Sequence, residues 1–66
     1  MRAAVARKLH NGDEVFLKGV SATVLGFREE RLGVLRFSLL VGNGYVEAYH
    51  DELEAFPAKA RRPHGQ

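Results

Sequence analysis

The chain has 66 residues, a hydrophobic fraction of 45%, no cysteine and a formal net charge of +2. This length corresponds to one small domain near the lower limit for independent folding. The lack of cysteine excludes disulfide bonds and thiolate metal sites. No apolar run approaches the roughly 20 residues of a membrane span, and the first residues do not resemble a signal peptide. We therefore expect a soluble cytoplasmic protein.

The net charge is distributed unevenly along the chain. Residues 1–10 and 57–66 each carry three basic residues and no acidic one, whereas residues 11–56 contain four basic and eight acidic residues. The middle of the chain therefore carries a net charge of −4, and the sequence pI of about 9.4 arises from the ends. We predict a folded domain over residues 11–56, a flexible or short helical arm over 1–10 and a disordered basic tail over 57–66.

The arm begins with an alanine-rich stretch in which Val5 and Leu9 are four residues apart. That spacing is typical of a helical turn, but nine residues form only a marginal helix in isolation. A flexible arm and an added edge strand remain the alternatives.

The first half of the domain is predicted to contain two strands, over residues 14–18 and 22–28. A break at Gly19 separates them, and Gly26 within the second strand predicts a bulge or a sharp bend. Residues 29–31 are predicted to form a solvated connection.

The strongest local signal is the dipeptide Asn43-Gly44 between two apolar runs, which predicts a β-hairpin closed by a type I′ turn. The register that follows pairs Val41 with Val46, Leu39 with Ala48, Phe37 with His50, Leu40 with Glu47, Ser38 with Tyr49, and Arg36 with Asp51. Apolar side chains then share one face of the hairpin and mostly polar side chains share the other.

Residues 50–52 predict a single 3₁₀ turn that places Leu53 in the core, and residues 54–56 predict a last short strand. Five short strands with a 3₁₀ turn before the last are typical of an all-β, five-stranded SH3-like barrel. The chain also resembles small bacterial SH3-like barrel proteins over residues 11–56. The resemblance lies in Gly12-Asp13-x-Val15, a glycine-containing break, Val24-x-Gly26-Phe27 and Asp51-Glu52-Leu53-Glu54.

Within that group, Val46-Glu47-Ala48-Tyr49 is similar to the Val-Gln-Ile-Tyr motif of type II plasmid dihydrofolate reductases at its first and last positions. This resemblance implies a subunit of an oligomeric reductase that forms a central pore. The residues themselves favour a non-enzymatic protein, because no credible general base accompanies Ser38. The spacing of the histidine and acidic residues over 50–54 matches no metal-ligand pattern. We expect no catalytic residue, cofactor or metal.

The polar face of the hairpin is the candidate binding surface. Tyrosine supplies an amphipathic plane and arginine a planar fork of donors, and an exposed leucine beside them is typical of a buried contact. We predict an interaction module that binds another protein or a second copy of itself through Arg36, Leu40, Tyr45, Glu47 and Tyr49. An ordinary solvated sheet face is the alternative interpretation.

A nucleic-acid-binding accessory protein is the other function that the charge distribution indicates. Flexible basic ends contact the phosphate backbone without sequence preference and with strong salt dependence. The residues that would do so are Arg2, Arg7, Lys8, Lys59, Arg61 and Arg62. The hairpin face does not suit this function, because Glu47 and Asp51 repel phosphate. The basic ends have a simpler alternative role, which is to keep the chain in solution.

Overall fold

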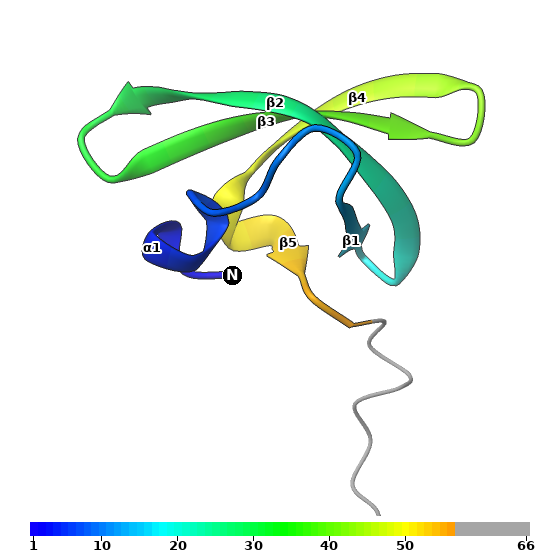
Figure 1. The fold of residues 1–66 in the computed structure, drawn as a ribbon, viewed down its shortest axis with the longest axis horizontal. Coiled ribbons are helices and arrows are strands. Elements are labelled where there is room, and N and C mark those ends of the chain that lie inside the picture. Colours follow the sequence, from blue (N-terminus) through cyan, green and yellow to red (C-terminus); the bar gives the residue numbers. More distant parts are fainter. Residues whose placement is uncertain (57–66) are drawn as a thin grey trace, which may run out of the picture.

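The computed structural model of the chain describes residues 1–56 (Figure 1). The predicted basic tail, with Lys59, Arg61 and Arg62, lies outside the described residues. The elements are, in order, α1 (Ala3–Ala6), β1 (Glu14–Leu17), β2 (Val20–Arg31), β3 (Val34–Val41), β4 (Gly44–Tyr49), the 3₁₀ turn η1 (His50–Glu52) and β5 (Leu53–Glu54). Among the described residues no helix has the length and apolar character needed to cross a membrane.

The strands form one antiparallel sheet in the order β4-β3-β2-β1-β5. This confirms the prediction of an all-β, five-stranded fold. The sheet is open, however, because β4 and β5 are its two edges and do not pair with each other within residues 1–56. β5 has only two residues, and both pair with β1. The long strand β2 bends, so that β1, β5 and α1 lie on one side of the ribbon formed by β2, β3 and β4 (Figure 1).

The first hairpin differs slightly from the sequence-based prediction. β1 ends at Leu17, because Lys18 and Gly19 both have positive φ values of 54° and 84° and form the turn. The second strand therefore begins at Val20, earlier than predicted. At the other end of the domain, η1 matches the predicted 3₁₀ turn and Leu53 is fully buried as expected. The last strand starts at Leu53, one residue earlier than predicted.

Two bulges shape β2. The pairing between β2 and β3 shifts between Val24 and Gly26, which confirms the predicted bulge, and shifts again between Glu29 and Arg31. The first shift reverses the alternation of side chains, so Phe27 lies opposite the buried Phe37, with ring centroids 4.8 Å apart. Strict alternation along the predicted strand over residues 22–28 places Phe27 and Val24 on opposite faces, and this expectation was wrong.

The solvated connection predicted over residues 29–31 was also wrong, because β2 continues through Arg31. The connection to β3 is instead the short turn at Leu32 and Gly33. Gly33 has a φ of 78°, which glycine adopts without a steric penalty.

The β3–β4 hairpin has a different turn from the predicted one. Val41 pairs with Gly44, so the turn residues are Gly42 and Asn43. Gly42 has a φ of 58° and Asn43 has no positive φ, a combination typical of a type II′ turn with glycine first. The predicted type I′ turn at Asn43-Gly44 was wrong, and the true register is displaced by two residues.

This displacement leaves every side chain on its predicted face, because alternation along a strand has a period of two. It does change the cross-strand neighbours. Arg36 lies opposite Tyr49 rather than Asp51, and Glu47 lies opposite Ser38 rather than Leu40.

The core lies between the inner face of the sheet and the elements that cover it. Its buried side chains are Ala6, Val15, Ala22, Val24, Leu35, Phe37, Leu39, Ala48 and Leu53, and no polar residue of the described range is buried. The amino group of Met1 donates to the carbonyl oxygen of Leu53 at 2.7 Å, and Nδ1 of His50 lies 3.0 Å from the carbonyl oxygen of Met1. The arm thus closes the inner face and leaves the opposite face of β2, β3 and β4 accessible.

Candidate functional site

The candidate site lies on the outer face, which we define as the side of β2, β3 and β4 that points away from the core. In β3, the buried residues Leu35, Phe37 and Leu39 alternate with side chains that point outward. The same alternation holds in β4 around the buried Ala48. All members of the predicted binding set therefore share this face: Arg36, Leu40, Tyr45, Glu47 and Tyr49.

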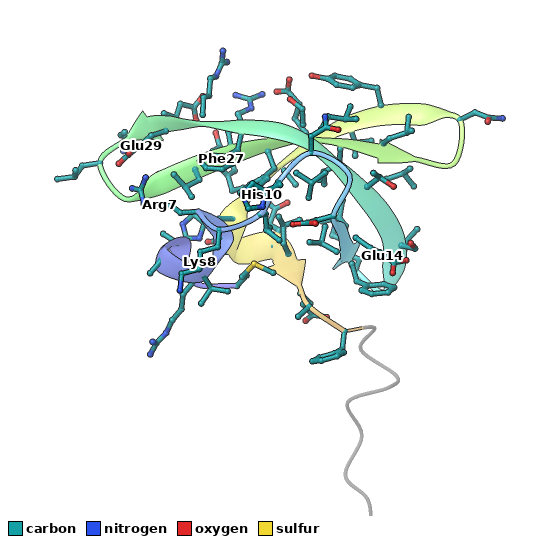
Figure 2. All side chains as sticks on the ribbon, viewed as in Figure 1. Arg7, Lys8, His10, Glu14, Phe27 and Glu29 are labelled. Atoms are coloured by element: carbon teal, nitrogen blue, oxygen red, sulfur yellow. The ribbon has the colours of Figure 1, made fainter. Side chains whose placement is uncertain are left out.

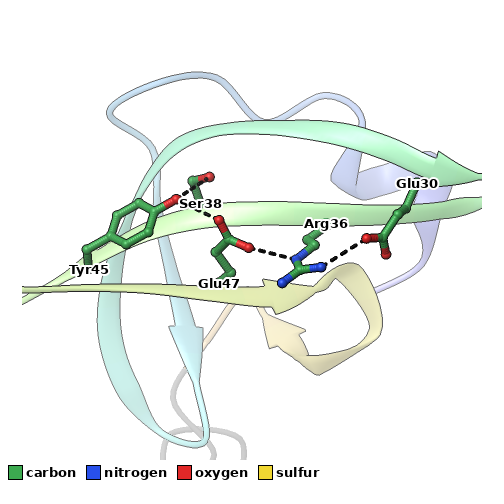
Figure 3. A network of polar contacts seen from close by, with 5 residues as sticks. All are labelled: Glu30, Arg36, Ser38, Tyr45 and Glu47. Carbon is green, nitrogen blue, oxygen red and sulfur yellow. Dashed lines mark hydrogen bonds and ion pairs between the residues drawn. The ribbon is translucent and has the colours of Figure 1, made fainter.

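A continuous network of polar contacts crosses the outer face (Figure 3). The Tyr45 hydroxyl donates to Oε2 of Glu47 at 2.7 Å, and a second hydrogen bond of 3.2 Å joins the hydroxyls of Tyr45 and Ser38. Oε1 of Glu47 lies 2.7 Å from Nε of Arg36, whose Nη1 donates to Oε2 of Glu30 at 2.9 Å. The network holds the side chains of three strands in one arrangement.

The electrostatics of the network keep both carboxyl groups charged. A hydrogen bond from Tyr45 and the positive charge of Arg36 hold the pKa of Glu47 below its usual value. Hydrogen bonds from Tyr49 and Arg36 lower the pKa of Glu30 in the same way, and the bond to Glu30 raises the pKa of Tyr49. These shifts move the pKa values of Glu30, Glu47 and Tyr49 further from neutral pH. Such an arrangement suits binding better than proton transfer, which needs a pKa near the working pH.

Arg36 also contacts an aromatic ring. Its Cζ atom lies 5.7 Å from the centroid of Tyr49, its cross-strand neighbour. A guanidinium over a tyrosine face is attracted by the ring electrons. Arg36 is therefore held on three sides, by two carboxylates and a ring.

Exposed apolar groups lie beside the network. Tyr45 is 60% exposed and Leu40, directly opposite it, is 42% exposed. Leu25 and Tyr49 are also exposed, and alternation from the buried Val24 places Leu25 on the outer face. The outer face thus combines apolar contact area with fixed polar groups.

A shallow hollow of about 250 Å³ lies within this face. Its lining residues are Phe27, Arg28, Arg36, Ser38, Tyr45 and Glu47. Next to it, Gly26 pairs with Ser38, and a Cβ added to Gly26 would meet no atom within 4 Å. Small residues on neighbouring strands therefore leave room between the larger side chains.

Arg28 and Glu30 belong to the outer face but are missing from the predicted binding set. Both follow the bulge after Val24, which reverses the alternation of side chains, and Glu30 occupies the second bulge. The glycine at position 26 was the one signal in the sequence that pointed to this reversal. Arg28 lies opposite Arg36 and forms no hydrogen bond or ion pair with any other residue of the described range.

The basic residues of the arm have different surroundings. Nη2 of Arg7 lies 3.0 Å from Oε1 of Glu29, and Figure 2 shows both side chains near the end of β2. Arg2 and Lys8 are exposed. No group of three or more histidine, aspartate or glutamate side chains within residues 1–56 is arranged to hold a metal ion.

Comparison with known proteins adds no relative. No protein-family model, no curated protein and no solved structure matches this chain. Its function must therefore be inferred from the geometry of the outer face.

Proposed function

We propose that the chain is a non-enzymatic interaction module that binds another protein through the outer face. One observation carries this proposal. Tyr45 is the most exposed side chain of the network, and its hydroxyl is fixed by hydrogen bonds to Glu47 and Ser38. A large apolar ring held in one position loses little conformational entropy when a partner covers it.

The charges of the outer face support the same proposal. Arg28 and Arg36 balance Glu30 and Glu47, so the group carries no net charge. Arg36 and both carboxylates already have partners at 2.7–2.9 Å. A partner that covers them does not leave buried polar groups unpaired, which would cost about 1–3 kcal/mol for each group.

The same geometry indicates the chemistry of the partner. Leu40 and Tyr45 offer an apolar contact. Arg28 attracts Glu30 and Glu47 electrostatically but forms no hydrogen bond or ion pair within residues 1–56, so its donors can bind a partner. Arginine recognises carboxylates through its planar fork of donors. We expect a partner segment with an apolar anchor and an acidic side chain close to it.

Selection of peptides from a displayed random library on the folded protein tests this proposal. Enriched peptides are then titrated against Leu40→Ser and against Val20→Ser as the matched control. Val20 is 52% exposed but lies at the start of β2, outside the outer face. We expect Leu40→Ser to weaken binding by about tenfold, since removing a buried leucine contact at an interface costs roughly 1.5 kcal/mol. Equal affinity for both variants would exclude the outer face as the binding surface.

The other functions predicted from the sequence, a pore-type reductase subunit and a nucleic-acid-binding accessory protein, stay predictions. The cytoplasmic location also stays a prediction.

A further inference from the structure

The outer edge of β4 is open. Within residues 1–56, β4 is hydrogen-bonded to β3 alone, so it is an edge strand of the sheet. Its six residues contain no proline and no lysine, and its pairing with β3 has no bulge. These are the features that commonly protect an exposed edge from pairing with another strand. β4 lacks all three.

The register determines which backbone groups face this edge. The residues that flank a two-residue turn, here Val41 and Gly44, form a hydrogen-bonded pair. Hydrogen-bonded and non-hydrogen-bonded pairs then alternate along the hairpin. The backbone groups of Tyr45, Glu47 and Tyr49 therefore point away from β3, toward the open edge.

We propose that β4 pairs antiparallel with β4 of a second copy of this chain, about a two-fold axis at Val46. Tyr45 of each copy then forms a hydrogen-bonded pair with Glu47 of the other. Val46 lies opposite Val46 of the second copy in a non-hydrogen-bonded pair, where the Cα atoms approach to about 4.5 Å. The two sheets become one continuous sheet.

A register centred on Glu47 is the competing arrangement. It would form three hydrogen-bonded pairs instead of two: Tyr45 of each copy with Tyr49 of the other, and Glu47 with Glu47. It would also place the two Glu47 carboxylates directly opposite each other, and like charges in that position are destabilising. The pKa of Glu47 is already held low, so this group does not escape the repulsion by taking up a proton at neutral pH. The register centred on Val46 is therefore favoured.

A second copy fits this edge because the strand complements itself. Glu47 is the one charged residue of β4. The register centred on Val46 places Tyr45 of one copy opposite Glu47 of the other, so the tyrosine hydroxyl lies beside the carboxylate of the neighbouring strand. Tyr45 and Glu47 already form such a bond within one chain, at 2.7 Å. The dimer does not depend on binding at the outer face, and it joins the outer faces of two copies into one surface.

Single cysteines test the register directly, since the chain contains none of its own. Val46→Cys is compared with Glu47→Cys and with Val20→Cys, an exposed position outside β4. Each variant is oxidised mildly, and covalent dimers are followed by non-reducing electrophoresis. We expect Val46→Cys to cross-link at least about tenfold faster than the other two, because only that pair comes within the Cα separation of about 4.4–6.8 Å that a disulfide needs. Equal rates for the three variants would overturn the pairing. An equimolar mixture of Tyr45→Cys and Tyr49→Cys keeps both Glu47 carboxylates and links across the register centred on Glu47, so faster linking of this mixture than of Val46→Cys would overturn the proposed register.

The unchanged chain provides the second test. Its mass by light scattering is expected to rise from 7.4 kDa toward twice that value with concentration. Glu47→Pro removes an edge donor without removing a bond to β3, and should hold the mass at that of the monomer. Glu47→Gln keeps the donor and should dimerise, and circular dichroism checks that both variants fold. Leu40→Ser should dimerise normally, which separates this proposal from the one for the outer face. A monomer mass at all concentrations up to about 1 mM would exclude the dimer.

Discussion

The two faces of β2, β3 and β4 are built from the same strands but differ in what covers them. The inner face buries Leu35, Phe37 and Leu39 beneath the arm, β1 and β5. The outer face exposes Leu40 and Tyr45, and its charged groups pair with one another rather than with a covering element. Apolar residues on the inner face therefore stabilise the fold, whereas those on the outer face are available for binding.

The largest expected effect comes from a core residue of β3. Phe37→Ala leaves a cavity and should lower the free energy of unfolding by about 3–5 kcal/mol. Leu40→Ala, on the outer face of the same strand, should change it by no more than about 0.5 kcal/mol. Urea denaturation followed by circular dichroism measures both. Similar losses for the two variants would show that the faces do not differ in their contribution to stability.

The arm gives the next largest effect. Ala6 is fully buried on α1, so Ala6→Asp places a carboxylate in the core without a partner and should cost more than about 2 kcal/mol. Ala4 belongs to the same helical turn but is exposed, and Ala4→Asp should leave the melting temperature nearly unchanged. Thermal unfolding of the two variants decides whether the arm covers the inner face. Equal melting temperatures would mean that it does not.

The turn that sets the register of the outer face should respond more modestly. Gly42→Ala forces a side chain into a backbone conformation with a φ of 58° and should cost about 1–2 kcal/mol. Gly44 has no positive φ, and a Cβ there would lie 3.5 Å from the carbonyl oxygen of Val41, an ordinary contact. Gly44→Ala should therefore be nearly neutral in urea denaturation. A larger loss of stability for Gly44→Ala than for Gly42→Ala would indicate that the turn lies at Asn43-Gly44 after all.

The smallest expected effect is a dependence of stability on pH. The pKa values of Glu29, Glu30 and Glu47 are lowered in the folded protein from an ordinary value of 4.5. The folded state therefore binds fewer protons than the unfolded state, and the stabilisation is present above pH 4.5 and is lost as the pH falls through the lowered values. Tyr45→Phe removes the hydrogen bond to Glu47 and should make the decline shallower. Urea midpoints across this pH range measure the slope, and identical slopes would mean that this bond has no effect on the pKa of Glu47.

The amino-acid sequence by itself determined the number of strands, the two faces of the β3–β4 hairpin and the position of the 3₁₀ turn. Each of these depends on local patterns. Alternation with a period of two assigns Arg36, Tyr45 and Glu47 to one face in both the predicted and the observed register, because the two registers differ by two residues. Gly26 marks a bulge because glycine tolerates the distorted backbone. The burial of Leu53 was predicted from the 3₁₀ turn at residues 50–52, which directly precedes it.

The tertiary structure decided the features that depend on partners distant in sequence. The turn lies at Gly42 and Asn43 instead of Asn43 and Gly44. The register therefore differs from the predicted one by two residues, a difference that no alternating pattern can detect. The bulges brought Arg28 and Glu30 to the outer face, because their orientation depends on how β2 pairs with β3. The packing of the arm on the core and the open form of the sheet could not be predicted from the sequence for the same physical reason. Burial and strand pairing depend on which surfaces meet, and local propensity does not contain that information.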